Sequence, residues 1–148
     1  MRDIGIYIGR FCPFHKGHQA VINHMIKRFS VDDLLVFIGS SNSPIEWRVL
    51  FTYEDRRRWI KRLYPEIKLM GLPDYPDNDT VWFHMLDDYI NCTFGTEVNP
   101  VFFGGAEEDV SFYYQYGRNV EIIDRNNFQC SGTNIRLLLL MEDRKSVV

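Results

Sequence analysis

The chain has 148 residues, the length of a single domain, and we expect one domain over residues 1–148. Apolar residues make up 45% and charged residues 25%, and the formal net charge of −3 argues against broad nucleic-acid binding, which usually carries a basic excess. No apolar run approaches the ~18 residues that cross a membrane and the first run is too short for a signal peptide, so we expect a cytoplasmic protein.

The apolar pattern switches repeatedly between strand-like runs and helix-like stripes. In chain order it predicts a strand over 4–9, a helix over 18–29, a strand over 34–39, a helix over 53–64, a strand over 66–72, a helix over 81–92, a strand over 100–105, a helix over 109–117, a strand over 119–124 and a helix over 132–144. Thr52 is expected to cap the second helix, and Asp79 or Thr80 the third.

Strict alternation of strands and helices with short connections predicts an α/β fold, with a five-stranded parallel sheet and helices on both faces. In such sheets ligands bind beyond the carboxyl ends of the strands, near the point where the strand order reverses. The segments expected at that edge are 9–18, 39–48, 72–80, 104–109 and 124–133. The three cysteines (Cys12, Cys92 and Cys130) are scattered, which indicates reduced thiols and no disulfide framework.

The connection after the first strand, GRFCPFHKGH (9–18), carries most of the chemistry. The start of the following helix offers unpaired N–H groups and the positive end of a dipole, both of which attract phosphate. Gly17 has no side chain to keep a phosphate away, and Arg10 adds a cation. His15 and His18 are three residues apart, so both imidazoles can face one ligand.

Other interpretations compete at this segment. Two nearby histidines are often only capping or surface residues. Cys12, His15 and His18 are donor types that bind zinc, although no fourth ligand stands near them. A dinucleotide-binding turn requires G-x-G-x-x-G, which the segment lacks.

The segment GRFCPFHKGH closely resembles the G-R-F-x-P-F-H-x-G-H signature of the H-x-G-H nucleotidyltransferase superfamily. Within it the match is to nicotinamide mononucleotide adenylyltransferases, both the archaeal type and the adenylyltransferase half of enzymes fused to a Nudix domain. CSGTNIR (130–136) resembles the S-x-T-x-I-R element of the same family. The resemblance covers essentially the whole chain and implies a Rossmann-like nucleotidyltransferase fold.

The resemblance also implies roles for individual residues. The expected catalytic residues, which hold the ATP phosphates, are His15, His18 and Arg136. The expected ATP-binding residues are Gly9, Arg10, Phe11, Gly17, Ser131, Gly132 and Thr133. The expected nicotinamide nucleotide-binding residues are Ser40, Arg48, Asn78 and Trp82.

Structural readings stay open for several of these residues. Ser131 and Thr133 are plausible helix caps, Arg136 a surface charge and Trp82 a core residue. If Trp82 is functional, it offers an aromatic face to the pyridinium ring. The motif does not choose between Asn78 and Asp79 as the residue that binds the carboxamide.

The chain departs from the family pattern at two places, one segment of three residues and one single residue. Ala106, Glu107 and Glu108 stand where the Nudix-fused enzymes carry basic residues, and Cys12 replaces a polar amide or acid. Two acids would repel a nearby phosphate unless they help to place Mg²⁺ or point away.

The activity that the resemblance implies joins ATP and nicotinamide mononucleotide into NAD, with release of pyrophosphate. The phosphate of the mononucleotide would attack the α-phosphorus of ATP in line, with Mg²⁺ accompanying ATP and no tightly bound organic cofactor. The expected partners are these two small molecules, without nucleic acid or membrane, and a homo-oligomer is left open. The alternatives are a related transferase acting on pantetheine phosphate, a flavin nucleotide or a small phosphorylated alcohol, and a non-catalytic nucleotide-sensing domain.

Overall fold

The computed structural model describes residues 1–46 and 49–123 and contains a regular alternation of strands and helices. The strands are β1 (Arg2–Gly9), β2 (Leu34–Gly39), β3 (Lys68–Leu72), β4 (Val98–Gly104) and β5 (Asn119–Ile122). The helices are α1 (Lys16–Arg28), α2 (Tyr53–Leu63), α3 (Asp79–Phe94) and α4 (Glu107–Gln115), with a short 3₁₀ helix, η1 (Val31–Asp33), before β2. Each element predicted up to residue 122 is confirmed to within a few residues at its ends, and the helix predicted over 132–144 lies outside the described residues.

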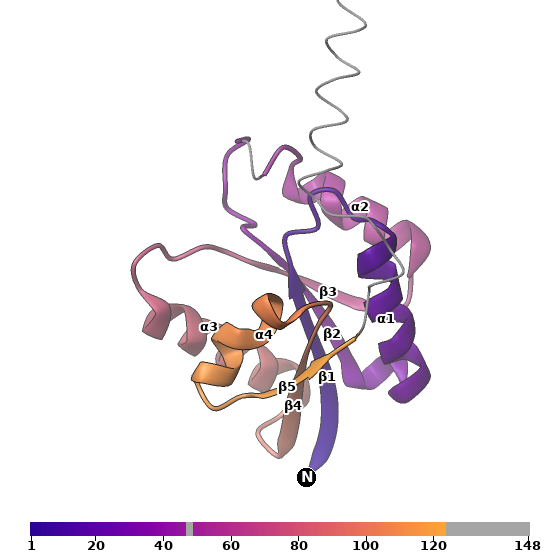
Figure 1. The fold of residues 1–148 in the computed structure, drawn as a ribbon, viewed down its shortest axis with the longest axis vertical. Coiled ribbons are helices and arrows are strands. Elements are labelled where there is room, and N and C mark those ends of the chain that lie inside the picture. The colour runs from indigo at the N-terminus through magenta and orange to yellow at the C-terminus, as the bar shows by residue number, and fades with distance from the viewer. Residues whose placement is uncertain (47–48, 124–148) are drawn as a thin grey trace, which may run out of the picture.

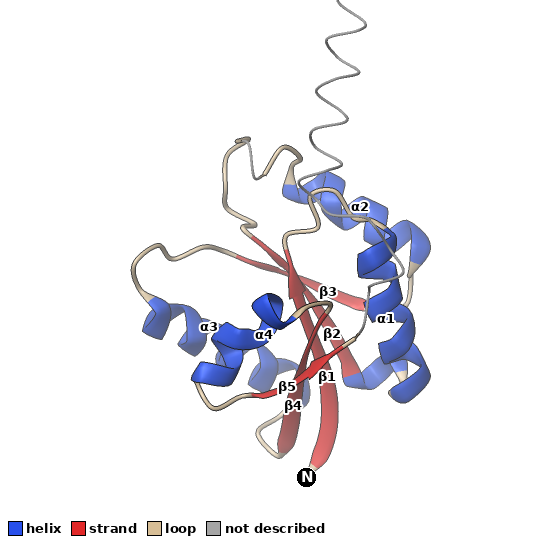
Figure 2. Cartoon of the chain, viewed as in Figure 1, coloured by secondary structure: helices blue, strands red, loops and turns tan. Residues whose placement is uncertain are grey.

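The five strands form one parallel sheet in the order β3-β2-β1-β4-β5, so the predicted α/β fold is confirmed (Figure 2). β1 is central, and its Gly5 is paired with Leu34 of β2 on one side and Val101 of β4 on the other. The chain builds outward from β1 to β3, then returns to the other side of β1 for β4 and β5. The order therefore reverses between β1 and β4, where this fold class leaves a crevice for ligands.

Helices cover both faces of the sheet, α1 and α2 on one and α3 and α4 on the other (Figure 1). The side chains of β2 alternate between two cores, with Val36 and Ile38 on the α1–α2 side and Leu35 and Phe37 on the α3–α4 side. Because both faces are buried, the strand reads as the uninterrupted apolar run LLVFIG.

The capping residues were only partly predicted. Thr52 caps α2 as expected, because its Oγ1 accepts a hydrogen bond from the Asp55 N–H at 3.1 Å. The prediction for α3 was wrong: Asn78 is the cap, and its Oδ1 accepts from the Val81 N–H at 3.1 Å. The helix therefore starts two residues early, and Asp79 lies in its first turn, where a carboxylate is stabilised by the helix dipole.

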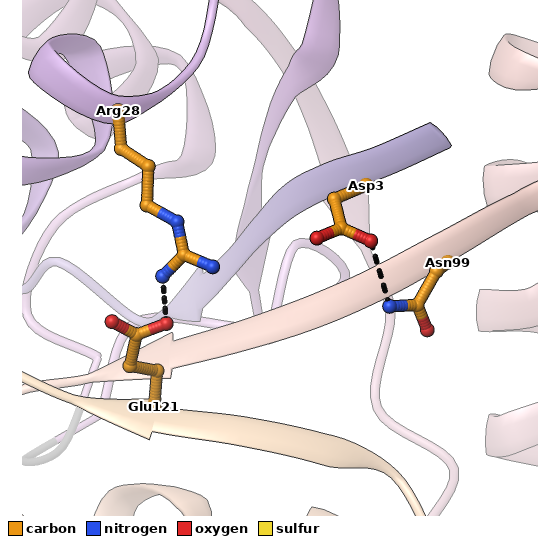
Figure 3. Close-up of polar contacts among 4 residues, drawn as sticks. All are labelled: Asp3, Arg28, Asn99 and Glu121. Carbon is orange, nitrogen blue, oxygen red and sulfur yellow. Dashed lines mark hydrogen bonds and ion pairs between the residues drawn. The ribbon is translucent and has the colours of Figure 1, made fainter. Parts of the chain in front are cut away.

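Polar contacts between strands tie the sheet together (Figure 3). Asn99 donates a hydrogen bond to Asp3 at 2.9 Å and accepts one from Asn119 at 2.7 Å, which links β1, β4 and β5. Arg28, at the end of α1, pairs with Glu121 of β5, and its guanidinium lies 5.1 Å above the ring of Phe29. Asp3 and Asn99 lie near the amino ends of their strands, away from the carboxyl ends where ligands are expected.

Within residues 1–46 and 49–123, none of the helices has the length and apolar character needed to span a bilayer.

Candidate active site

A cleft opens at the carboxyl ends of β1 and β2, at the point where the strand order reverses. Its main cavity, about 490 Å³ in volume, is lined by residues 8–10 and 39–40, by Asp74 after β3, by Trp82 of α3 and by Glu108, Asp109 and Tyr113 of α4. A cavity of about 170 Å³ adds His18 to the walls near Arg10. A third cavity, of about 410 Å³, extends past Trp82 to Asp79, and Arg10 lines all three.

The two predicted histidines lie together at the start of α1. His15 is the N-cap residue, and its Nδ1 accepts a hydrogen bond from the Gly17 N–H at 3.1 Å. A second hydrogen bond runs in the opposite direction: the His15 N–H donates to Nδ1 of His18 at 3.2 Å. The rings stack with centroids 3.7 Å apart. The capping interpretation and the shared-ligand interpretation are thus compatible, since one arrangement serves both.

This reciprocal cap fixes the chemistry of both imidazoles. Because Nδ1 of each ring accepts a backbone hydrogen, the neutral ring carries its own hydrogen on Nε2. Each histidine is therefore set in the tautomer that donates from Nε2. The Gly17 amide is used within the cap, so the helix offers a phosphate its imidazoles and dipole rather than that N–H.

The zinc interpretation gains no support from the geometry. Among residues 1–46 and 49–123, no group of three or more His, Cys, Asp or Glu side chains is arranged to hold a metal ion. Cys12 is buried and forms no disulfide.

Gly9 and Phe11 shape the turn that leads to the histidines. Phe11 has a φ of +53°, in the left-handed region that bulky residues rarely adopt, and its ring packs edge-on against His18 at 4.9 Å. A Cβ on Gly9 would lie 2.7 Å from the Phe11 ring, so only glycine fits there. Gly9 lines the cleft, whereas the Phe11 side chain is buried and supports His18 from below.

Arg56 of α2 holds the main chain that follows β1 and β2 in place, a role that was not predicted from the sequence. The side chain is fully buried and donates to the carbonyl oxygens of Arg10 at 3.0 Å, Gly39 at 2.7 Å, Ser40 at 3.0 Å and Thr52 at 3.3 Å. Burial lowers the pKa of the guanidinium, because the surrounding protein stabilises the charge less than water does. The signal in the sequence is that Phe51, Thr52 and Arg56 fit the F-T-x-x-E-R pattern of the family that GRFCPFHKGH resembles.

The residues predicted to bind the nicotinamide nucleotide differ in whether they line the cleft. Ser40 is buried and Trp82 half-buried, and both line the main cavity. Trp82 also packs 5.1 Å from Phe83, so it is part of the core and of the cleft. Asn78 uses its Oδ1 to cap α3, and of the two candidates it is Asp79 that lines the cleft. A direct role for Asn78 stays a prediction.

The cleft has an acidic wall. Asp74, Glu108 and Asp109 line the main cavity, and among the described residues that line it Arg10 is the one cation. Glu107, Glu108 and Asp109 form the first turn of α4, whose N-cap residue Ala106 supplies no side-chain bond. Carboxylates are favourable at a helix start, which gives these acids a local reason to be present. Among the described residues of the cleft, the charge that favours a phosphate is therefore at Arg10 and at the start of α1.

Five predicted site residues lie outside the described residues: Arg48, Ser131, Gly132, Thr133 and Arg136. Their roles stay predictions.

The chain matches a family model described as cytidylyltransferase-like over residues 6–138. A nicotinamide-nucleotide adenylyltransferase from Saccharolobus solfataricus is 30% identical over 150 aligned positions, which cover 96% of this chain and 82% of that protein.

Solved structures give the same picture of the fold. The bifunctional NMN adenylyltransferase/ADP ribose pyrophosphatase of Francisella tularensis superposes with a TM-score of 0.79 at 22% identity, over 93% of this chain and 42% of that one. A second structure of that enzyme, complexed with AMP and a manganese ion, superposes with a TM-score of 0.75 at 21% identity, over 93% and 41%. This chain thus spans less than half the length of the bifunctional protein, and likeness at these identities concerns the fold.

Proposed function

The chain belongs to the cytidylyltransferase-like family of nucleotidyltransferases, and from that premise we propose that it transfers the adenylyl group of ATP to nicotinamide mononucleotide, forming NAD and pyrophosphate. The observation that carries the proposal is the stacked histidine pair at the start of α1: His18 lines a small cavity together with Arg10, and Arg10 and Trp82 line the main cavity. A dinucleotide-forming enzyme needs such a layout, with a site for phosphates and a site for an aromatic base.

The charges of the cleft support one orientation of the acceptor. Nicotinamide mononucleotide carries an anionic phosphate and a cationic pyridinium ring. The phosphate is attracted to Arg10 and to the positive end of α1, whereas the ring is attracted to Asp74, Glu108 and the face of Trp82. The acidic wall that would repel a misplaced phosphate therefore favours the pyridinium.

The reaction needs positioning more than proton transfer. A phosphate dianion is already a nucleophile, so no general base is required for its in-line attack on the α-phosphorus. His15 and His18 donate from Nε2 to the triphosphate and stabilise the charge that develops on the departing pyrophosphate. Arg136 and the segment that contains Ser131, Gly132 and Thr133 are proposed to complete this phosphate site.

A divalent metal belongs to the substrate in this proposal. We expect Mg²⁺ to enter with ATP, held mainly by the triphosphate, because the described residues include no cluster of three metal-binding side chains. The manganese in the AMP complex of the Francisella enzyme supports a divalent ion in this fold. The net charge of −3 supports small-molecule partners, and the thiols of Cys12 and Cys92, which form no disulfide, support a cytoplasmic setting.

The test is an assay of the full chain with Mg·ATP and a panel of acceptors. NAD formation is measured by enzymatic reduction to NADH, and pyrophosphate release is measured in parallel. We expect turnover with nicotinamide mononucleotide and little with pantetheine phosphate or flavin mononucleotide. Efficient transfer to one of those acceptors instead would favour a different branch of the superfamily, and binding of ATP without turnover of any acceptor would favour a sensing domain.

A further inference from the structure

A buried tyrosine of α4 forms part of the cleft wall. Tyr113 is 8% exposed, and its ring stacks on Phe102 with centroids 5.1 Å apart and planes 22° from parallel. On the cleft side Trp82 lies nearly parallel to it, at 6.2 Å and 17°. Tyr113 and Trp82 both line the main cavity, so this aromatic stack reaches from the sheet into the cleft.

The hydroxyl of Tyr113 has an unusual environment. A buried phenol normally finds a hydrogen-bond partner, yet within residues 1–46 and 49–123 no group bonds to this hydroxyl. Burial, with a smaller contribution from the Asp109 carboxylate, raises the pKa of the phenol well above its ordinary value. The group therefore keeps its proton and is a donor that lacks an acceptor in this part of the chain.

The layout of the cleft indicates what that acceptor is. In the proposed function Arg10 takes the phosphate end of the acceptor nucleotide and Trp82 offers a face for its base, and both residues line the main cavity. Tyr113 stacks with Trp82 and lines the same cavity, so in the proposed arrangement it lies on the side of the base rather than of the phosphate.

We propose that the Tyr113 hydroxyl donates a hydrogen bond to the substituent on the pyridine ring of the acceptor nucleotide, which makes Tyr113 a specificity-determining residue. This inference rests on the proposed function. An enzyme group that is left unpaired in the free protein and paired by the substrate discriminates strongly against acceptors that lack the bonding atom.

The test compares Tyr113→Phe with Tyr114→Phe in steady-state kinetics. Tyr114 is the next residue of the same helix and is 70% exposed, so its variant is a matched control for the loss of one hydroxyl. For Tyr113→Phe we expect KM for nicotinamide mononucleotide to rise about tenfold, with kcat and KM for ATP within about twofold of the wild type. Tyr114→Phe should leave all three values unchanged.

Two further measurements separate recognition from structure. Since the hydroxyl has no partner among the described residues, Tyr113→Phe should keep or raise the thermal midpoint of the ligand-free protein. With an acceptor analogue that lacks the ring substituent, wild type and Tyr113→Phe should have the same KM.

The possible outcomes distinguish a failure of the proposed function from a failure of the Tyr113 inference alone. If the wild type forms no NAD from nicotinamide mononucleotide, the proposed function fails and this inference fails with it. If the wild type is active and Tyr113→Phe keeps its KM for that acceptor, only the inference is overturned. A lowered thermal midpoint with equal losses for both substrates would overturn it as a structural effect. A KM increase that persists with the analogue would also overturn it, because the Tyr113 hydroxyl would then bond to another part of the acceptor.

Discussion

Two histidines at the start of α1 cap the helix, and they are proposed to bind the phosphates of ATP. His18 accepts the His15 N–H at 3.2 Å through Nδ1, which sets the tautomer that carries its hydrogen on Nε2. His18→Ala removes both functions and should lower turnover by about 10²–10³-fold, the usual cost of one donor to a developing anion. Steady-state kinetics measure the loss. An equal loss of turnover is expected for Arg136→Ala.

A second substitution separates the two functions of His18. Glutamine at this position of a helix can accept the N-cap N–H, so His18→Gln should restore the stability that His18→Ala loses. Its turnover should stay as low as that of His18→Ala because the imidazole is missing. If His18→Gln were as active as the wild type, His18 would be a capping residue only.

Arg56 holds the cleft through main-chain carbonyls, so its contribution belongs to stability and positioning. Arg56→Met would leave the carbonyls of Arg10, Gly39 and Ser40 without this donor, and we expect a loss of about 3 kcal/mol in the free energy of unfolding. Arg57→Met, at the exposed neighbour, should change it by less than about 0.5 kcal/mol. Urea denaturation measures both, and an unchanged Arg56→Met protein would contradict this role.

Individual residues show which contacts a sequence pattern can predict and which it cannot. The histidine pair was predictable because its partners are local, three positions apart. Arg56 was not, because it bonds to the carbonyl of Arg10, 46 positions away, and no local pattern encodes that contact. The buried hydroxyl of Tyr113 was also beyond prediction, since its environment exists only after α4 packs on the sheet.

At the scale of elements, periodicity located each strand and each α-helix up to residue 122, but not every end and not the short η1. The start of α3 was misplaced because Asn78, Asp79 and Thr80 are all good capping residues, and the choice among them depends on backbone geometry. Asn78 has a φ of −141° and directs Oδ1 to the Val81 N–H. The residue types alone do not specify this backbone angle, so they do not select the cap.

The capping role of Asn78 gives a prediction about α3. Asn78→Ala should lower the free energy of unfolding by about 1 kcal/mol, whereas Asn78→Asp should keep the cap and most of the stability. Chemical denaturation tests both variants. If Asn78 only caps the helix, KM for nicotinamide mononucleotide should be unchanged in Asn78→Asp. A large rise in that KM would instead support the predicted contact between Asn78 and the nucleotide.

For the whole molecule, the fold class followed from strand–helix alternation, but the strand order did not. An alternating pattern is compatible with several orders of five parallel strands, and the observed β3-β2-β1-β4-β5 order depends on which edges pair. The charge balance of the cleft was equally hidden. It combines Arg10 after β1, Asp74 after β3 and Glu108 on α4, which only the folded chain brings to one cavity.

That charge balance predicts a preference between acceptors. Nicotinic acid mononucleotide carries a carboxylate that would face Asp74, Glu108 and Asp109, so its KM should exceed that of the amide by about tenfold. The difference should shrink at high salt and in Glu108→Gln, because screening or removal of a carboxylate weakens the repulsion. Equal KM values for the two acceptors at low salt would contradict this account of the cleft.

The most direct test of the whole account is a crystal structure of the full chain with a non-hydrolysable ATP analogue and nicotinamide mononucleotide. The account predicts that the triphosphate contacts Nε2 of His15 and His18 and the guanidinium of Arg136. It also predicts that the pyridine ring lies against Trp82, with the acceptor phosphate near Arg10 and aligned with the α-phosphorus. A triphosphate bound away from the start of α1, or an acceptor outside the cleft that Arg10 and Trp82 line, would contradict it.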